Sequence, residues 1–269
     1  MELPEQVQAI CESFTHALNH SAEGLLEGLY LRGSLCWGEF FTSSDVDYTA
    51  VLSRRPQADD LRALEAAHAQ VWLDFTDHDF DGHHVVIEDL QRPADQCPPV
   101  PCTHAGSFEP EGRTDLNPVA WHELATRAIR VTGRDPRVLG IHAPHEELVA
   151  YSRENLAAYW ARTARELKLG WLVIGRHDDA VAWSALGVAR LHHLLATGEM
   201  TSKSGAGRYV QTTLDERWHK LAAEALRIRE DPSASSHYGS LSERGKDLRD
   251  FVAWAVADGE ARAQEARHG

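Results

Sequence analysis

The sequence lacks any hydrophobic run that could cross a membrane, since no stretch approaches the roughly 20 consecutive apolar residues of a spanning helix. The N-terminal segment MELPEQVQAICESF also lacks a basic part followed by an apolar part, so we expect no secretory signal. Internal repeats and low-complexity tracts are missing as well. These absences predict a cytoplasmic protein with no membrane partner.

Cysteine is scarce, with four residues in a chain of 269. Cys97 and Cys102 are separated by a spacing that is not typical of zinc ligands, and no second pair follows them. We therefore expect free thiols, as in a reducing compartment. The overall composition is that of a soluble globular protein, with 43% hydrophobic and 25% charged residues, and the length allows one large or two modest domains.

Basic residues are few relative to acidic ones, 27 against 41, and the net charge is −14. Such a surface repels nucleic acid over most of its area and attracts a polycationic small molecule. The same acidity is also explained by solubility alone. We expect no nucleic-acid partner, and the charge by itself does not identify a ligand.

One stretch, residues 29–52 (LYLRGSLCWGEFFTSSDVDYTAVL), contains two strand-like runs joined by turn residues and a short helix. Asp45 and Asp47 are two apart, so on a strand their carboxylates share a face and repel each other unless a cation lies between them. Mg²⁺ prefers such oxygen ligands, usually beside substrate phosphates. Gly33 has no side chain to exclude a phosphate, and Ser34 offers an N–H and a hydroxyl. The stretch predicts a triphosphate and metal site.

These residues also carry a family resemblance. Gly33-Ser34, ten residues and then Asp45-Val46-Asp47 resemble the GS-x10-DxD signature of polymerase-β-type nucleotidyltransferases, most closely the streptomycin/spectinomycin (aminoglycoside) adenylyltransferases. The resemblance implies that the two aspartates bind two Mg²⁺ ions and are catalytic. It assigns nucleotide binding to Gly33, Ser34 and Ser44. The alternative is that the two aspartates only cap a turn.

A third carboxylate is expected from the next strand, which follows the turn-rich segment 75–82 (FTDHDFDG). The resemblance implies that Asp81 completes the metal site and acts as general base, with Asp77 and Asp79 as alternatives. His83 and His84 are adjacent on this strand, so they point to opposite faces and cannot share one ion without distortion. We expect one of the two imidazoles to face inward and the other outward.

The rest of the N-terminal half predicts two amphipathic helices, residues 4–20 and 58–72. Residues 91–112 are rich in proline and predict a long loop with one short strand near 100–104. A helix from Asn117 and a short strand at 129–132 follow. The predicted fold is an α+β nucleotidyltransferase domain, a small mixed sheet of four or five strands with helices, spanning residues 1–142.

Residues 143–269 predict an all-α C-terminal helical bundle with its own core, which we expect to bind substrate and nucleotide. Five helices are expected, at 146–169, 178–196, 202–210, 215–229 and 241–267. The segment 186–203 is similar to the LxxAR…TG…TSK run of the same adenylyltransferases. That similarity implies that Arg190 and Lys203 contact the nucleotide phosphates. The alternative is a salt-bridged Arg190 and a solvated Lys203.

The acceptor site is less well marked. The resemblance offers four substrate-binding candidates, which are Asp178, Asp179, Trp183 and Trp121. The predicted function is Mg²⁺-dependent transfer of AMP from ATP to a hydroxyl of a small molecule, an aminoglycoside antibiotic, by a monomeric resistance enzyme. The alternatives are a different acceptor (a nucleoside antibiotic, a peptide antibiotic or a protein) or a non-catalytic nucleotide-binding partner protein. Retention of Ser34, Asp45 and Asp47 argues against the non-catalytic alternative.

Overall fold

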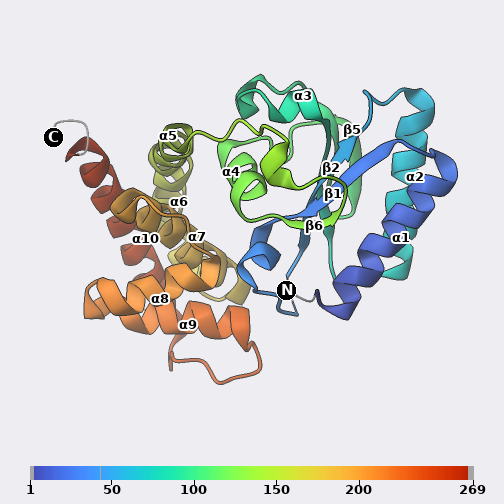
Figure 1. The fold of residues 1–269 in the computed structure, drawn as a ribbon. Coiled ribbons are helices and arrows are strands. Elements are labelled where there is room, and N and C mark those ends of the chain that lie inside the picture. Colours follow the sequence, from blue (N-terminus) through green and yellow to red (C-terminus); the bar gives the residue numbers. More distant parts are fainter. Residues whose placement is uncertain (1–2, 43, 266–269) are drawn as a thin grey trace. The chain divides into compact units, whose positions relative to one another are not determined.

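The computed structural model describes residues 3–42 and 44–265. The chain divides into two compact units, Met1–Leu148 and Val149–Gly269 (Figure 1). The domain boundary expected at residues 142–143 stays a prediction. Among the described helices, none is long and apolar enough to span a bilayer.

The first unit is built on a six-stranded mixed sheet with the order β5-β4-β3-β2-β1-β6. Its strands are β1 Leu26–Leu31, β2 Val46–Leu52, β3 Phe80–Val86, β4 Val100–His104, β5 Ser107–Gly112 and β6 Ile129–Thr132. Only β2 and β3 pair in parallel, while the other neighbours are antiparallel. Parallel strands need a crossover, and α2 Ala58–Asp74 supplies it. The predicted mixed sheet with helices is therefore confirmed.

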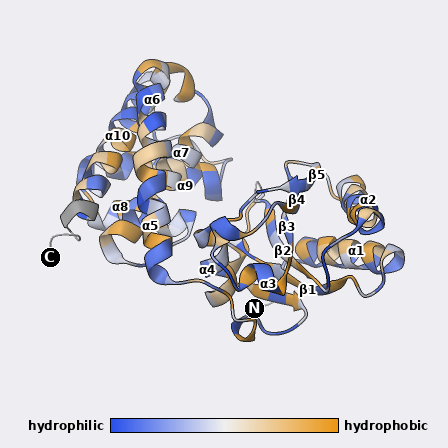
Figure 2. Ribbon diagram, turned by 90° about the horizontal axis from the view of Figure 1, so that it is seen from above, coloured by the Kyte–Doolittle hydropathy of each residue, from blue (hydrophilic) through white to orange (hydrophobic). Residues whose placement is uncertain are grey.

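Helices cover both faces of this sheet. α1 Glu5–Ser21 and α2 lie side by side on one face, and they pack against Tyr48 and Ala50 of β2 (Figure 1). α3 Ile87–Leu90 and α4 Pro118–Thr126 cover the other face, where Val51 packs with Trp121. Neighbouring side chains of β2 face opposite sides of the sheet because a strand has a two-residue repeat. Figure 2 shows both hydrophobic and hydrophilic residues along α1 and α2. Both faces of the central strands β2 and β3 are thus buried.

The proline-rich segment differs from the predicted long loop. After the short 3₁₀ turn η2 Ala94–Gln96 it forms the hairpin of β4 and β5, with Ala105 (φ 48°) and Gly106 (φ 70°) in its turn. The sheet consequently has six strands instead of four or five. Pro110 is tolerated because β5 is an edge strand, where a missing N–H costs no internal ladder bond.

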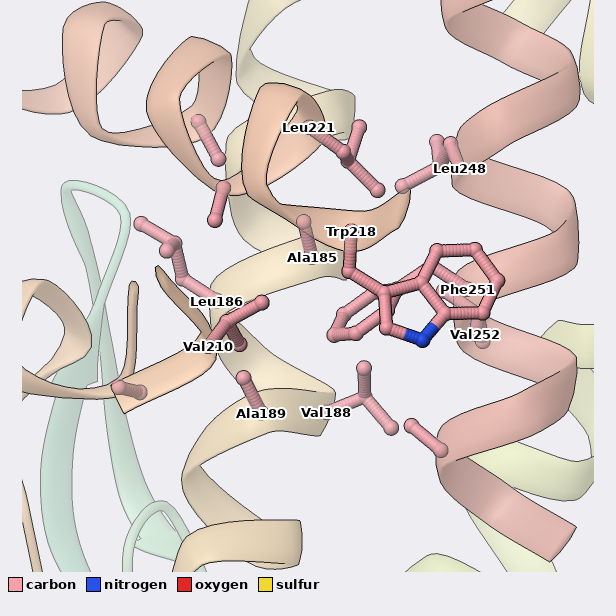
Figure 3. Close-up of a cluster of buried hydrophobic side chains, with 14 of the residues drawn as sticks. Ala185, Leu186, Val188, Ala189, Val210, Trp218, Leu221, Leu248, Phe251 and Val252 are labelled. Atoms are coloured by element: carbon pink, nitrogen blue, oxygen red, sulfur yellow. The ribbon is translucent and has the colours of Figure 1, made fainter. Parts of the chain in front are cut away.

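Every secondary-structure element in the described part of the second unit is helical. After α5 His145–Asn155, which spans the boundary between the units, a π-helical turn η4 Leu156–Trp160 interrupts the predicted first helix. The following elements are α6 Ala161–Ile174, α7 Asp178–Thr197, α8 Lys203–Thr213, η5 Glu216–Trp218, α9 His219–Glu230 and α10 Leu241–Glu265. Trp218 and Phe251 meet edge to face in its core, beside Val188 and Leu221 (Figure 3).

An ionic network centred on the buried Glu224 lies in the same unit. The Glu224 carboxylate has no exposed surface and lies 3.1 Å from an Arg227 nitrogen and 2.9 Å from Arg244 Nη1. Asp178 at the start of α7 accepts from the same two guanidinium groups, at 3.0 and 2.7 Å. Arg244 also donates from Nε to the Gly175 carbonyl. The network links α7, α9 and α10 and has no net charge.

Candidate active site

Four strand ends meet at one edge of the sheet in the first unit. β2 and β3 begin there, and β1 and β4 end there, because β1 and β4 run antiparallel to their neighbours. The parallel register places Asp47 directly opposite Asp81. The Arg32 amide after β1 donates to the Asp47 carbonyl at 2.8 Å. The structure thus places Asp47 next to Asp81 and beside the turn that begins at Gly33.

Gly33 begins the 3₁₀ turn η1 Gly33–Trp37 with φ at +61°, in the region that favours glycine. A Cβ on this residue would lie 1.8 Å from Asp47 Oδ2. Glycine is therefore required at this position for two reasons: the positive φ and the Asp47 carboxylate that lies against its Cα. Ser34 follows in the same turn and is half-buried.

Asp47 lies in a strongly acidic environment. Burial and, to a smaller extent, the nearby carboxylates of Asp115, Glu123 and Asp45 together raise its pKa to about 7, against the opposing effect of the Arg32 guanidinium. One cation is thus set against several anions. A bound divalent cation would relieve this excess of negative charge, since opposite charge favours the ionised carboxylate.

Arg32 is almost completely buried below Asp47, on the α4 face of the sheet. Its Nη2 donates to Asp115 Oδ2 at 3.3 Å, and its Nε donates to Thr49 Oγ1 at 2.9 Å. His83 Nδ1 lies 3.2 Å from the Thr114 carbonyl, so it carries the proton, and His83 Nε2 accepts from the Thr49 hydroxyl. Burial lowers the pKa of His83 to about 3, so the imidazole is neutral in this network.

His83 and His84 point to opposite faces of β3, as expected. The expectation that one of them faces outward is wrong, because both are buried. Helices on both sides of the sheet leave no exposed face here. His84 contacts the Tyr48 hydroxyl and His68 Nε2 on the α1/α2 face, and burial lowers its pKa to about 4.

The Asp81 carboxylate is held by the β4–β5 hairpin. Both of its oxygens accept from the Ala105 amide, at 3.1 and 3.0 Å, and Oδ2 lies 3.1 Å from His104 Nδ1. Burial raises its pKa, while these two donors act in the opposite direction. Asp77 and Asp79 are exposed and precede the strand. The register therefore favours Asp81 over these two residues as the neighbour of Asp47.

No group of three or more His, Cys, Asp or Glu side chains in the described part of the chain is arranged to hold a metal ion. Asp45 is exposed just before β2, and Asp81 is engaged by the hairpin. The type of donor nevertheless suits a hard cation, because carboxylate oxygens and an excess of negative charge meet at Asp47. The residues fit Mg²⁺ in chemistry, without a preformed cage.

Ser44 is buried, and its hydroxyl oxygen accepts from the Phe41 amide at 2.9 Å. Its carbonyl lies 2.7 Å from His78 Nδ1, so the residue fixes the loop before Asp45. The hydroxyl keeps one proton with which it could contact a phosphate. Its predicted nucleotide role stays a prediction.

Glu123 is a site residue that the sequence reasoning missed. It lies on α4 with 4% of its surface exposed, and Oε2 accepts from the Gly33 amide at 3.2 Å. A signal was available in the sequence: the neighbouring positions Ala120 and Leu124 mark the apolar face of this helix, and a glutamate on that face is unusual. Arg32 and Asp115 were missed as well, and no comparable pattern marks either residue.

Arg190 and Lys203, the predicted phosphate contacts in the helical unit, are both half-buried. Arg190 lies on α7, and Lys203 is the first residue of α8. Ser202 caps α8, because its Oγ accepts from the Gly205 amide at 2.8 Å. The phosphate contacts of both basic residues stay predictions.

The acceptor candidates differ in their surroundings. Asp178 belongs to the ionic network described above, whereas Asp179 is exposed. Trp183 is 44% exposed and stacks on Trp160 at a centroid distance of 5.1 Å. Trp121 has no exposed surface, and its indole N–H donates to the Arg92 carbonyl. Because it fills the core under α4, Trp121 cannot reach an acceptor in this conformation, and we leave it out of the proposed site.

No known protein-family profile and no curated protein matches this sequence. Among solved structures, the chain is similar to spectinomycin adenyltransferase AAD(9) from Enterococcus faecialis, whose crystal structure contains ATP and spectinomycin. The TM-score is 0.62 and the identity 14%, over 91% of this chain and 98% of the other. At this identity the similarity concerns the fold alone. The chain therefore has a fold similar to that of this adenyltransferase.

Proposed function

We propose that the protein is a Mg²⁺-dependent adenylyltransferase that moves AMP from ATP to a hydroxyl of a small molecule, an aminoglycoside antibiotic. The observation that carries the proposal is the placement of Asp47 against Gly33 and opposite Asp81 at one edge of the sheet. The fold similarity to an adenyltransferase solved with ATP and spectinomycin supports the same chemistry. ATP is the co-substrate in this proposal, and the enzyme acts as a monomer.

The reaction is an in-line displacement at the α-phosphorus of ATP. The acceptor oxygen forms a bond to this phosphorus, the bond to the bridging oxygen breaks, and pyrophosphate leaves. Two Mg²⁺ ions held by Asp45, Asp47 and Asp81 would neutralise charge on the phosphates and the leaving group. The Asp81 carboxylate takes the proton of the attacking hydroxyl, and its bonds from Ala105 and His104 fix its orientation.

Phosphate binding in the first unit is assigned to the Gly33 amide, the Ser34 amide and hydroxyl, and the Ser44 hydroxyl. Arg190 and Lys203 are proposed as further phosphate contacts on the basis of the sequence resemblance. Phosphoryl transfer depends largely on positioning and on cations around the triphosphate, which these groups supply.

We expect Arg190→Ala to weaken binding of ATP about ten- to a hundredfold, because a charge-assisted contact contributes roughly 1.5–3 kcal/mol. Calorimetry with α,β-methylene ATP and Mg²⁺ measures the change. Arg162→Ala is the matched control, since Arg162 is 61% exposed on α6 and pairs with Glu166. Equal affinities of Arg190→Ala and the parent would remove Arg190 from the nucleotide site.

The aminoglycoside is proposed as acceptor because its ammonium groups complement a chain of net charge −14. Asp179 and Trp183 are exposed and available for such a contact, whereas Asp178 is already paired with two arginines. Pyrophosphate release from ATP, measured with spectinomycin, streptomycin, nucleoside antibiotics and peptide antibiotics in parallel, tests the choice. Release with another acceptor alone would move the proposal to that acceptor, and release with none would remove it.

A further inference from the structure

The Gly33 amide, which the proposed function assigns to a nucleotide phosphate, already has an anionic acceptor in the protein. Glu123 Oε2 lies 3.2 Å from the Gly33 nitrogen, and the Glu123 side chain is 4% exposed. On the other side of the same residue, Asp47 Oδ2 lies against the Gly33 Cα. The first residue of the turn is thus held between two carboxylates.

A backbone N–H carries one hydrogen and makes one strong hydrogen bond at a time. A phosphate oxygen and the Glu123 carboxylate therefore cannot both occupy this donor. Two anions at the same amide also repel each other, and the repulsion is strong where water is excluded. When a phosphate binds at Gly33, the Glu123 carboxylate must move away. Otherwise the two anions share one N–H, and each hydrogen bond is weaker.

α4 also contacts the same turn at a second point. The Arg127 guanidinium lies 3.8 Å from the centre of the Trp37 ring, at the end of η1. This contact does not depend on the Glu123 carboxylate. The contact between Arg127 and Trp37 therefore remains when the hydrogen bond from Gly33 to Glu123 is altered. For this reason we expect variants of Glu123 to keep the turn in place in the folded protein.

We propose that Glu123 occupies the hydrogen-bonding position of a phosphate oxygen at the Gly33 amide, and that it lowers nucleotide affinity by competing for this donor. The inference rests on the function proposed above. Glu123 acts here through Gly33 and is a positioning residue. Its carboxylate satisfies a buried amide in the nucleotide-free protein and is exchanged for phosphate when the nucleotide binds.

Glu123→Gln keeps the shape of the side chain and an acceptor oxygen but removes the charge. A neutral acceptor forms a bond about half as strong as a charged one, and its repulsion of phosphate is lost. We expect α,β-methylene ATP with Mg²⁺ to bind about five- to tenfold more tightly, with a lower KM for ATP. Calorimetry measures the affinity, and Glu65→Gln, an exposed position on α2, is the control for loss of one charge.

A second titration, with Mn²⁺ alone, separates competition from metal binding. We expect Glu123→Gln to bind Mn²⁺ no more tightly than the parent, so that tighter nucleotide binding cannot come from the metal. Weaker or unchanged nucleotide binding in Glu123→Gln, with a parent that binds the analogue, would overturn the inference and leave the proposed function standing. A parent that binds no nucleotide would overturn both. Glu123→Ala, which offers no acceptor, should show a gain at least as large as that of Glu123→Gln.

Discussion

Asp47→Asn should lower turnover by at least about 10²-fold, the scale on which loss of a key electrostatic group acts in an active site. The substitution keeps the shape of the side chain but removes a negative charge from a site that must hold divalent cations. At the same time we expect the melting temperature to stay equal or rise. Burial and three neighbouring carboxylates raise the pKa of Asp47 to about 7, so the charge is unfavourable in the metal-free protein.

The two readouts together distinguish a functional residue from a structural one. Steady-state turnover with the best acceptor of the panel measures the effect on function, and thermal unfolding measures the effect on stability. Asp77→Asn is the matched control, because Asp77 is exposed before β3 and is not opposite Asp47. Near-normal turnover of a folded Asp47→Asn protein would remove Asp47 from the catalytic site.

Glu224→Ala should destabilise the helical unit by about 3–5 kcal/mol, because it leaves Arg227 and Arg244 buried without their shared carboxylate. Glu224 also accepts from Ser236 Oγ at 2.7 Å and from the His237 amide at 2.8 Å, so four donors lose a partner. Unfolding by urea, followed by helical circular dichroism, measures the free energy. The loss is expected even though Asp178 remains, since one carboxylate cannot neutralise two guanidinium groups.

Glu243→Ala is the matched control for this loss. Glu243 lies in the same unit and pairs with Lys220 at 2.7 Å, but both side chains are exposed. An exposed pair contributes at most about 1 kcal/mol. Equal costs for the two substitutions would mean that burial of the network does not matter.

The network also predicts a dependence on pH. Burial alone would raise the pKa of Glu224, but the hydrogen bonds from Arg227, from the His237 amide and from the other donors lower it from 4.5 to about 2. A carboxyl group whose pKa is lower in the folded state than in the unfolded state stabilises the protein at pH values above its unfolded-state pKa. This contribution is therefore present above pH 4.5 and is lost as the pH falls towards 2. Glu224→Ala should lack this part of the acid dependence.

Local patterns made much of the first unit predictable. The turn at Gly33-Ser34 and the strand after Asp45 follow from residue types within a few positions of each other. The sequence resemblance pointed to Asp81 but left Asp77 and Asp79 as alternatives, because a slip of two residues in a turn leaves no local trace. The register of β3 in the structure favours Asp81. The register is set by strand pairing across the crossover α2, which is a non-local interaction.

The site residues that the sequence did not predict were missed for a different reason. Arg32, Asp115 and Glu123 are charged residues whose partners lie 83 to 90 positions away in the sequence. No periodicity marks such pairs. Asp178 also has non-local partners, because this helix-starting aspartate pairs with two distant arginines, and its predicted role in binding the acceptor stays a prediction.

The central claim is the transfer of AMP to a small molecule, and mass spectrometry of the acceptor tests it most directly. The protein is incubated with ATP, Mg²⁺ and spectinomycin or streptomycin, with Asp47→Asn protein and a reaction containing a chelator as controls. The account predicts that the aminoglycoside gains the mass of one AMP with release of pyrophosphate, and that both controls lose this product. If none of the tested antibiotics gains this mass although the folded protein binds ATP, the claim of AMP transfer to an aminoglycoside is contradicted.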